Sequence, residues 1–402
     1  MLLAVAIALL SVEAGRSQGL LQNQLTGLVH QTVAGIRFST QPGFVIERVN
    51  PATKTDSYVA FTFDSRGRLV VSKENDSPRI LLDTDVDGVY ESEQVITNRV
   101  QNCQGLWFDG PTLYGACAHT PPPAEGAAEA GARGGSGPTP AAGIFRLTDT
   151  DGDDVTDTFE VLARLGRIQE HGPHAIRRAP DGSVMVLIGN NETIPDASLD
   201  LNSPILEDRD GQFLPTLPGA GSSRREGAHS ALFRWFESAQ RFQVFSGGNR
   251  NAYDFAFSLS GEAFLFDSDN EADIGMPWYR DVRTTHQIPN GNYGYRNSSG
   301  KYPAYYLDSL PPVRDVGRGS PVGVETYSSD AYPREYFENL FEADWSRGRL
   351  LFTALTPSGA TFTARSDPPC RAGRHWPPMR TGSSIMEPLR TALPTAASRS
   401  PS

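Results

Sequence analysis

Hydrophobic and polar positions along this chain follow one unit that recurs. Each copy contains an apolar run, a turn that carries Asp or Ser together with Gly, and then a strand rich in β-branched residues. The copies occupy residues 58–73, 104–117, 174–190 and 253–267, and a looser copy occupies residues 341–356. Strand-rich units at this spacing predict an all-β β-propeller with about five visible blades, in which each blade buries its faces against its neighbours. A β-sandwich with irregular hairpins is the competing interpretation.

Segments outside this pattern set the expected domain boundaries. An apolar run followed by small residues predicts a secretory signal peptide over residues 1–14, with a buried N-terminal helix as the alternative. Residues 15–41 are expected to form a linker, and residues 42–365 the propeller. Pro, Ala and Gly dominate residues 119–143, which predicts a disordered loop inserted in a blade.

The C-terminal segment, residues 366–402, abandons strand periodicity directly after a good strand. It is rich in Pro, Ser, Arg and Thr, which indicates either a flexible tail or a reading frame that has shifted away from a further blade. A propeller that lacks its last blade exposes a sheet edge with a row of unpaired backbone groups. We therefore expect the propeller to be incomplete at its C-terminal end.

Charge and cysteine content narrow the classes of function. The formal net charge is −11, from 47 Asp and Glu against 36 Lys and Arg, and no basic stripe is visible. Nucleic acid is therefore excluded as a partner, whereas an acidic surface suits divalent cations. No run approaches the roughly 18 apolar residues of a membrane span. Cys103 and Cys117 flank a strand-turn pattern and could bridge in an oxidising compartment, and no C-x-x-C motif encodes a zinc ribbon or a c-type haem site.

Two acidic segments have the alternating oxygen pattern of calcium-binding loops. The candidate ligands are Asp83, Asp85 and Asp87 in the first loop, and Asp149, Asp151, Asp153 and Glu160 in the second. The first loop has Gly88 at the sixth position but Gln94 at the twelfth, and the second loop lacks the sixth-position glycine. The pattern predicts calcium, and the alternative is a pair of solvated acidic turns between strands.

Two histidines, His171 and His174, lie within five residues of each other at the start of a predicted hairpin. Gly and Pro separate them, and the apolar strand of residues 183–188 follows. Catalytic groups are often mounted on loops that a rigid sheet holds in place, so these imidazoles are candidates for chemistry. In the alternative interpretation, one histidine caps a turn and the other packs in the core.

A second candidate site lies near residues 247–257, where two glycines precede Arg250 and Asn251. Arg250 offers a planar donor fork for a carboxylate or a quinone oxygen, and Asn251 can both donate and accept. The alternative is an Arg-Asn pair that only caps a turn. Further along the chain, Asp267 and Asp269 form an oxygen-rich strand end, and the Gly-aromatic turn at Tyr293 is expected to expose a ring to a cleft.

The order of these motifs resembles the soluble quinoprotein glucose and sorbosone dehydrogenase superfamily. The matching features are the H-x8-P-D-G motif that begins at His171, G-x-R-N at residues 248–251, the acidic strand end, and G-x-Y-G-aromatic at residues 291–295. The greatest similarity is to the secreted propellers labelled membrane-bound dehydrogenases, and it extends over about residues 42–363. This resemblance implies a six-bladed propeller.

The resemblance also implies roles for single residues. His171 matches the base that takes the proton of a sugar hydroxyl while hydride passes to the quinone, a role that suits neutral imidazole near neutral pH. Arg250 and Asn251 match the pair that holds pyrroloquinoline quinone and orients the substrate, and Tyr293 falls in the cofactor-binding region. Where the family presents carbonyl oxygens of a Gly-Pro pair to calcium, this chain has Asp269 and Asn270, which makes Asp267 and Asp269 the candidate metal ligands there.

These expectations lead to two hypotheses of different classes. In the first, the chain is a secreted or periplasmic quinoprotein-type dehydrogenase that oxidises a sugar or polyol alcohol with His171 as general base. Because no haem motif is present, its electrons must leave to a separate carrier. In the second, it is a non-catalytic, calcium-stabilised propeller that binds a carbohydrate or a protein partner. A lactonase-like hydrolase with a central calcium is a third, weaker option.

Overall fold

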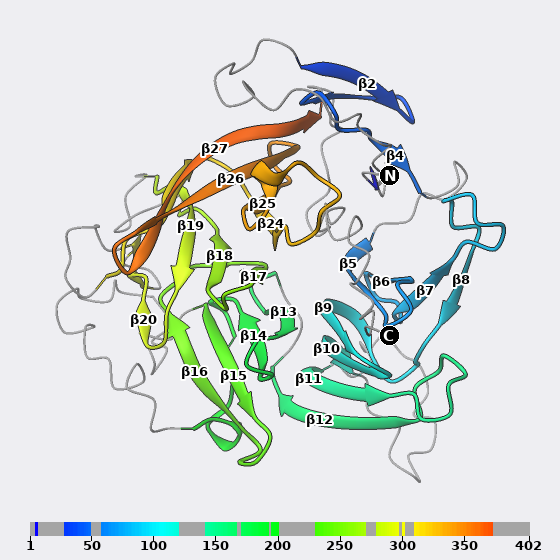
Figure 1. The fold of residues 1–402 in the computed structure, drawn as a ribbon. Helices are drawn as coiled ribbons and strands as arrows, with labels where there is room; N and C mark the ends of the chain where they lie inside the picture. The colour runs from blue at the N-terminus through cyan, green and yellow to red at the C-terminus, as the bar shows by residue number, and fades with distance from the viewer. Residues whose placement is uncertain are drawn as a thin grey trace, which may run out of the picture.

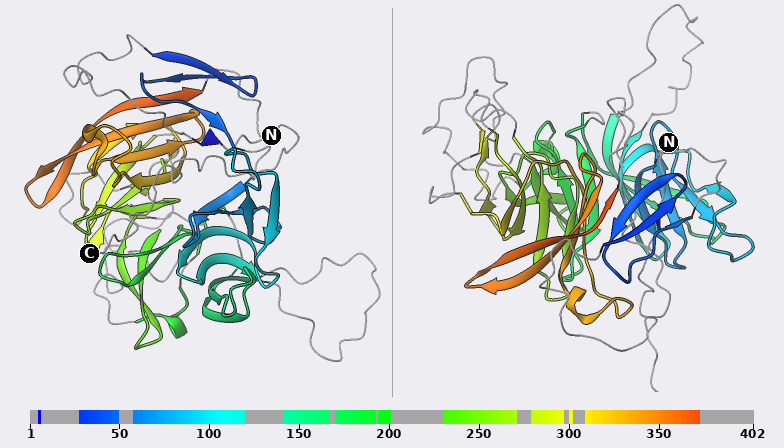
Figure 2. Two further views of the ribbon diagram at one scale, coloured as in Figure 1. Left: turned by 45° about the vertical axis from the view of Figure 1, so that its right-hand side comes forward. Right: turned by 90° about the horizontal axis from the view of Figure 1, so that it is seen from above.

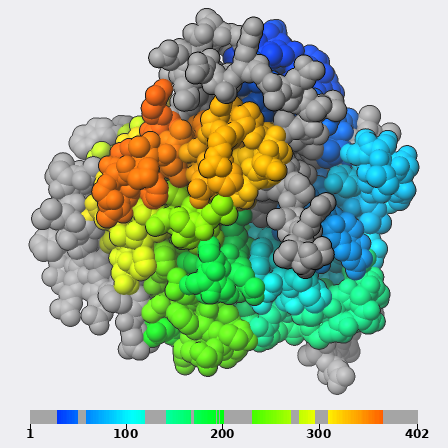
Figure 3. All heavy atoms as spheres, in the orientation of Figure 1, coloured from blue at the N-terminus to red at the C-terminus, as the bar shows by residue number. Residues whose placement is uncertain are grey.

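The computed structural model describes residues 28–49, 58–119, 141–166, 170–192, 194–200, 230–270, 279–296, 300–301 and 309–372, together with the short strand β1 (Val5–Ala6). Apart from two two-stranded pairs, the strands of the described residues form five larger, mainly antiparallel sheets that follow one another around a ring, each with one edge strand nearest the centre (Figure 1). The space-filling view shows the same succession of sheets around the ring in chain order (Figure 3). The prediction of an all-β propeller is confirmed.

The five sheets are named blades 1 to 5 in chain order. Blade 1 contains β5 (Tyr58–Phe63), β6 (Leu69–Lys73), β7 (Arg79–Leu82) and β8 (Ser92–Val95). Blade 2 contains β9 (Gln101–Asp109), β10 (Thr112–His119), β11 (Ala141–Thr148) and β12 (Thr158–Arg164). Blade 3 contains β13 (Pro173–Arg178), β14 (Val184–Ile188), β15 (Ala231–Phe236) and β16 (Arg241–Gly247). Blade 4 contains β17 (Phe255–Phe257), β18 (Ala263–Asp267), β19 (Val282–Gln287) and β23 (Arg314–Gly317). Blade 5 contains β24 (Pro321–Thr326), β25 (Leu340–Asp344), β26 (Arg349–Ser358) and β27 (Thr361–Ala372).

Shorter elements decorate the ring. They are β2 (Val29–Val33), β3 (Ile36–Thr40), β4 (Glu47–Arg48), β20 (Gly291–Asn292), β21 (Tyr295–Arg296), β22 (Gly300–Lys301), η1 (Asp196–Ser198) and η6 (Arg334–Tyr336). Strand β20 pairs in parallel with β16, so a loop of blade 4 extends the edge of blade 3. Strand β1 pairs with β4, and the rest of the predicted signal peptide, residues 1–14, lies outside the described residues.

The repeating sequence unit corresponds to the inner hairpin of a blade. The first four copies match β5–β6, β9–β10, β13–β14 and β17–β18, which are the first two strands of blades 1 to 4. The fifth copy matches β25–β26, the second and third strands of blade 5. The unit is looser there because it is out of phase by one strand, and the true first strand is β24.

Three predicted boundaries differ from the strands observed. His119 ends β10 and pairs with Ala141 of β11, so the ends of the predicted loop 119–143 are strand residues, and residues 120–140 lie outside the described part. Strands β2 and β3 form a hairpin inside the predicted linker 15–41. Strand β27 continues past residue 365 because its end pairs with β3, a partner more than 300 positions earlier in the chain. The β26–β27 hairpin also projects outward from the ring (Figure 2).

Apolar clusters fill the interfaces between successive blades. Phe255 and Leu265 of blade 4 pack against Leu187 and Leu232 of blade 3, and similar clusters join blades 1 and 2, 2 and 3, and 4 and 5. On blade 5 a further cluster includes Phe44, from the segment that follows β3. The apolar run of each strand therefore faces a neighbouring blade, which is why the strands read as nearly continuous hydrophobic stretches.

Covalent and ionic links add to these contacts. The predicted bridge between Cys103 and Cys117 is present and joins β9 to β10. Arg177 of β13 donates to Asp254, before β17, and to Glu325 of β24, both at 2.8 Å. One guanidinium thus ties blades 3, 4 and 5 together.

Candidate functional site

The Glu170–His174 segment is held at the inner end of blade 3 by backbone pairing. Gly189 donates its N–H to the carbonyl of Gly172 at 2.7 Å, and Asn191 donates to the carbonyl of His171 at 3.2 Å. A Cβ at Gly189 would lie 2.4 Å from Asn251 Oδ1 and 2.7 Å from the carbonyl carbon of His171. Only glycine permits this approach, so the residue after β14 brings the histidine segment and Asn251 together.

The His171 ring is half-buried, and Asn190 orients it. His171 Nδ1 lies 2.7 Å from Asn190 Oδ1, while Asn190 Nδ2 is 3.5 Å from the hydroxyl of Tyr295. With the amide oxygen facing the ring, Nδ1 carries the proton and Nε2 is the basic nitrogen. Sequence reasoning missed Asn190, although a polar residue directly after a buried strand was a usable signal.

His174 is fully buried and links two blades. Its Nδ1 lies 3.1 Å from Gln104 of β9, and its Nε2 lies 2.8 Å from Asn251 Oδ1. The ring packs on Tyr253 with 4.5 Å between centroids. The pKa of His174 is lowered to about 4, mainly by burial; the hydrogen bond to Asn251 opposes this effect, and the charge of the nearby His171 adds a smaller lowering. His174 is therefore neutral near neutral pH, and it contacts Asn251 rather than serving as a second base.

The loop that carries Arg250 and Asn251 is shaped by a buried ion pair. The Oδ1 atom of Asp267 accepts the backbone N–H of Arg250 at 2.9 Å and that of Asn251 at 3.2 Å. Its Oδ2 atom accepts Arg283 Nε at 3.0 Å, and Arg283 also donates to the carbonyls of Tyr293 and Gly248. Asp267 thus fixes the backbone of this loop from beneath. The Asn251 side chain lies beside the histidine segment, whereas the Arg250 side chain lies against Ser268 and Asp269.

Two of the predicted metal ligands have other partners. Asp267 is 0% exposed and uses its oxygens on Arg283 and on two backbone amides, so its assignment as a metal ligand is wrong. Asp269 accepts the Tyr279 hydroxyl at 2.5 Å and lies 3.8 Å from Arg250 NH1. Sequence spacing located this strand end, but it could not reveal that an arginine from β19 would neutralise the buried carboxylate.

Tyr293 does not line a cleft. Its ring is 0% exposed, its hydroxyl donates to the carbonyl of His286, and the hydroxyl accepts the N–H of Ile288 at 3.0 Å. The prediction that this turn exposes a ring is wrong because the turn folds back onto blade 3. Gly248, with φ of +79°, permits this turn to approach the end of blade 3, since a Cβ at Gly248 would lie 2.4 Å from Asn292 Oδ1.

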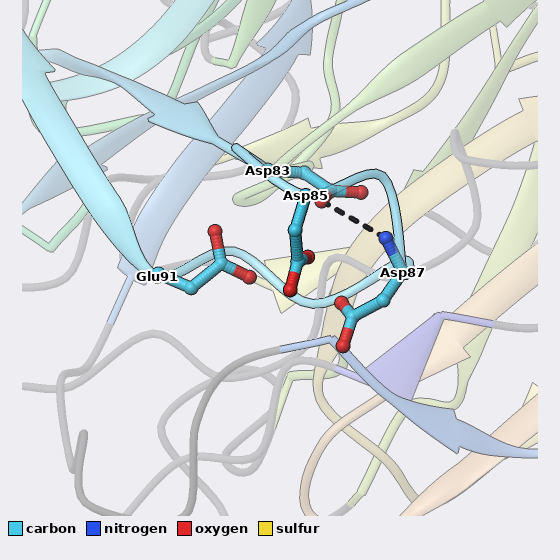
Figure 4. Close-up of side chains that lie close together, drawn as sticks. All are labelled: Asp83, Asp85, Asp87 and Glu91. Atoms are coloured by element: carbon cyan, nitrogen blue, oxygen red, sulfur yellow. Dashed lines mark hydrogen bonds between the residues drawn. The ribbon is translucent and has the colours of Figure 1, made fainter.

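The first acidic loop lies between β7 and β8 and gathers four carboxylates. An oxygen from each of Asp83, Asp85, Asp87 and Glu91 lies within 4.8 Å of the others, and Asp87 N–H donates to Asp83 at 3.2 Å (Figure 4). Partial desolvation, followed by the charges of Asp87 and Glu91, raises the pKa of Asp85. The fourth carboxylate is Glu91, at the ninth position, whereas the loop motif predicts a ligand at the twelfth. Oxygen donors of this kind suit calcium, which stays a prediction.

The second acidic loop, between β11 and β12, brings together three carboxylates. Oxygens of Asp149, Asp151 and Asp153 lie within 4.8 Å of one another. Glu160 is not among them: it lies on β12 and pairs with Arg146 at 2.5 Å, so its assignment to this loop is wrong. A strand begins at Thr158, and it carries the twelfth position away from the turn.

A cavity of about 210 Å³ adjoins this second loop, between blades 1 and 2. Its lining includes Arg68 and Asp154, which pair with each other at 2.7 Å, and apolar side chains such as Phe108. Neither His171 nor Arg250 lines it. The cavity is therefore separate from the histidine site.

Comparison with known proteins identifies the fold. No protein family model matches the chain, and no curated protein matches its sequence. A Trichoderma reesei protein of Carbohydrate-Active Enzymes Family AA12 aligns with a TM-score of 0.52 at 12% identity, over 86% of this chain and 89% of that one. The PQQ domain of pyranose dehydrogenase from Coprinopsis cinerea, in its holo form, aligns with a TM-score of 0.50 at 10% identity, over 83% and 82% of the two chains.

The chain shares the propeller fold of these two structures. At these identities the likeness concerns the fold, so the chemistry must be argued from the residues of this chain. No helix in the described part of the chain has the length and apolar character needed to cross a membrane.

Proposed function

We propose that the chain is a quinoprotein-type dehydrogenase that oxidises a hydroxyl group of a sugar or polyol. The observation that carries this proposal is the position of Asn251, which lies against the segment that holds His171. The amide nitrogen of Asn251 lies 3.4 Å from the carbonyl of Glu170, directly before the histidine. A candidate base, His171, thus lies in the segment that Asn251 contacts, and Arg250 is the preceding residue of the Asn251 loop.

His171 supplies the proton acceptor in this mechanism. Its Nδ1–H is held by Asn190, and in the proposed mechanism Nε2 takes the proton of a substrate hydroxyl as the C–H bond breaks. Asn190 is an uncharged partner, so it orients the ring without stabilising the imidazolium as a carboxylate would. The proton leaves His171 to solvent, for which the half-buried ring is suited.

The donor set fits the oxygens of a quinone. Arg250 NH1 and the amide of Asn251 are donors, and the Arg250 side chain is 17% exposed. Bound pyrroloquinoline quinone would supply the hydride acceptor of the reaction, and a separate carrier would reoxidise it. Asp267 does not fit the role of a calcium ligand at this site, because its carboxylate is committed to Arg283.

The test is an absorbance titration of the purified chain with pyrroloquinoline quinone, followed by dye-linked oxidation of sugars and polyols. His171→Gln is expected to retain quinone binding and to lose about 10²–10⁴-fold in kcat, the range for removal of a general base. His30→Gln, at an exposed histidine on β2, is the matched control. Absence of any quinone binding by the wild-type chain would overturn the proposal.

A second variant tests the role of Asn190. Asn190→Asp puts a carboxylate beside the Nδ1–H of His171, which stabilises the imidazolium. Because the base must be neutral to accept a proton, the acid limb of the kcat profile should move to higher pH. An unchanged profile would contradict the assignment of His171 as the base.

The second candidate function is a binding propeller without redox activity. The observation that favours it is the ion pair between Asp267 and Arg283, because the Asp267 carboxylate was expected to bind a central calcium ion and binds Arg283 instead. Retained binding of a carbohydrate with no quinone binding would identify this case. In either case we propose a secreted or periplasmic location, since the Cys103–Cys117 disulfide suits an oxidising compartment.

A further inference from the structure

His174 occupies a place that the proposed mechanism does not use. It is 0% exposed and lies between Gln104 of blade 2 and Asn251 before β17, and its ring packs on Tyr253. Within the pairs described it makes no hydrogen bond to His171. Its function must therefore lie in its effect on the side-chain amides of Gln104 and Asn251.

The contact between Asn251 and Glu170 selects one tautomer of the His174 ring. Asn251 donates from Nδ2 to the carbonyl of Glu170 at 3.4 Å, so its Oδ1 faces the ring and His174 Nε2 must carry the proton. A neutral imidazole carries one N–H, so Nδ1 must accept, and the Gln104 amide, whose Oε1 lies next to Nδ1 in the structure, must instead turn its NH2 toward the ring. Exchanging the oxygen and nitrogen of Gln104 leaves the 3.1 Å contact unchanged.

This arrangement fixes what Asn251 can offer a ligand. Its oxygen takes the N–H of His174 and is packed against Gly189, so the NH2 is the part of the amide that is left to face a bound molecule. An acceptor oxygen, such as a carbonyl, a quinone oxygen or an ether oxygen, is recognised there. If the ligand presents only a donor at this point, two hydrogen-bond donors face each other without an acceptor. Leaving donors unsatisfied in a partly buried site lowers the binding free energy.

We propose that His174 is a positioning residue that locks Asn251 as a hydrogen-bond donor toward the ligand, so that the site selects an acceptor oxygen at that point. The identity of the ligand rests on the proposed function, whereas the lock itself does not. The chain of hydrogen bonds that sets this orientation extends from Gln104 of blade 2 through His174 of blade 3 to Asn251, which precedes the first strand of blade 4.

The lock is tested first without any ligand or activity. In the full-length chain labelled with ¹⁵N-histidine, long-range ¹H–¹⁵N spectra distinguish the two tautomers of each ring. His174, assigned by its loss in His174→Gln, is expected to carry its proton on Nε2. Gln104→Glu should move the proton to Nδ1 or protonate both nitrogens, because a carboxylate only accepts, whereas Gln104→Met should leave it on Nε2. A proton on Nδ1 in the wild-type chain would overturn the inference.

The ligand is tested second, by quinone titration of two variants. The amide nitrogen of His174→Gln stands in for Nε2–H, so affinity should stay within about threefold of wild type. His174→Leu leaves the Asn251 oxygen without its donor, and affinity should fall on the order of tenfold or more. Equal affinities for wild type and His174→Leu would contradict the proposal. If the wild-type chain binds no quinone, the proposed function fails, and the spectra still decide the inference.

Discussion

Asp267 is expected to be one of the most sensitive positions for stability. Its carboxylate is 0% exposed and forms an ion pair with Arg283, whose side chain is 6% exposed. Asp267→Asn keeps one oxygen for the backbone amides of Arg250 and Asn251, but it turns an NH2 or a neutral oxygen toward the guanidinium. Breaking a buried ion pair by removing one partner costs about 3–5 kcal/mol, because the remaining charge is buried without compensation.

The assay is urea unfolding followed by tryptophan fluorescence, with calorimetry for the melting temperature. For a chain larger than 250 residues, roughly 2 °C is lost per kcal/mol, so the melting temperature should fall by about 6–10 °C. Asp109→Asn is the matched control, since Asp109 and Arg178 form an exposed pair, at 36% and 46% exposure, and should lose less than about 1 kcal/mol.

A double variant separates the charge from the packing. Adding Arg283→Met to Asp267→Asn removes the uncompensated guanidinium, so the double variant should be more stable than the sum of the two single losses predicts. A loss below about 1 kcal/mol for Asp267→Asn, or strict additivity in the double variant, would refute the claim that this pair organises the Arg250–Asn251 loop.

Three other predictions follow from the geometry. In calcium-free buffer, Asp85→Asn should be at least as stable as wild type, because it removes repulsion between carboxylates of the first acidic loop. In millimolar calcium, it should be less stable than wild type. Thermal melts that show no such reversal would exclude calcium at this loop. Replacing both Cys103 and Cys117 by Ala should lower the free energy of unfolding by about 3 kcal/mol, since the bridge closes a loop with a sequence separation of 14, and an unchanged urea midpoint would contradict this. The pKa of His174 is about 4 in the folded chain against an ordinary value of 6.5, so the unfolded chain binds more protons and stability should fall by about 3 kcal/mol as pH drops from 6.5 to 4. His174→Gln should remove this part of the pH dependence, and an unchanged slope in urea melts would show that the burial argument is wrong.

The sequence by itself determined the class of fold. Apolar runs and Gly-containing turns are local patterns, and each blade repeats them, so four of the five inner hairpins could be located without coordinates. The disulfide between Cys103 and Cys117 could be predicted for the same reason, since the two residues flank a single hairpin.

Only the tertiary structure decided which side chains meet across blades. Asp267 and Arg283 pair through neighbouring strands, Tyr293 turns inward, and Gln104, His174 and Asn251 come from three blades to form one chain of hydrogen bonds. Such contacts depend on how blades are rotated and packed against each other, which local periodicity does not encode. The carboxylate that the sequence offered as a metal ligand is, for that physical reason, the anchor of the Arg250–Asn251 loop.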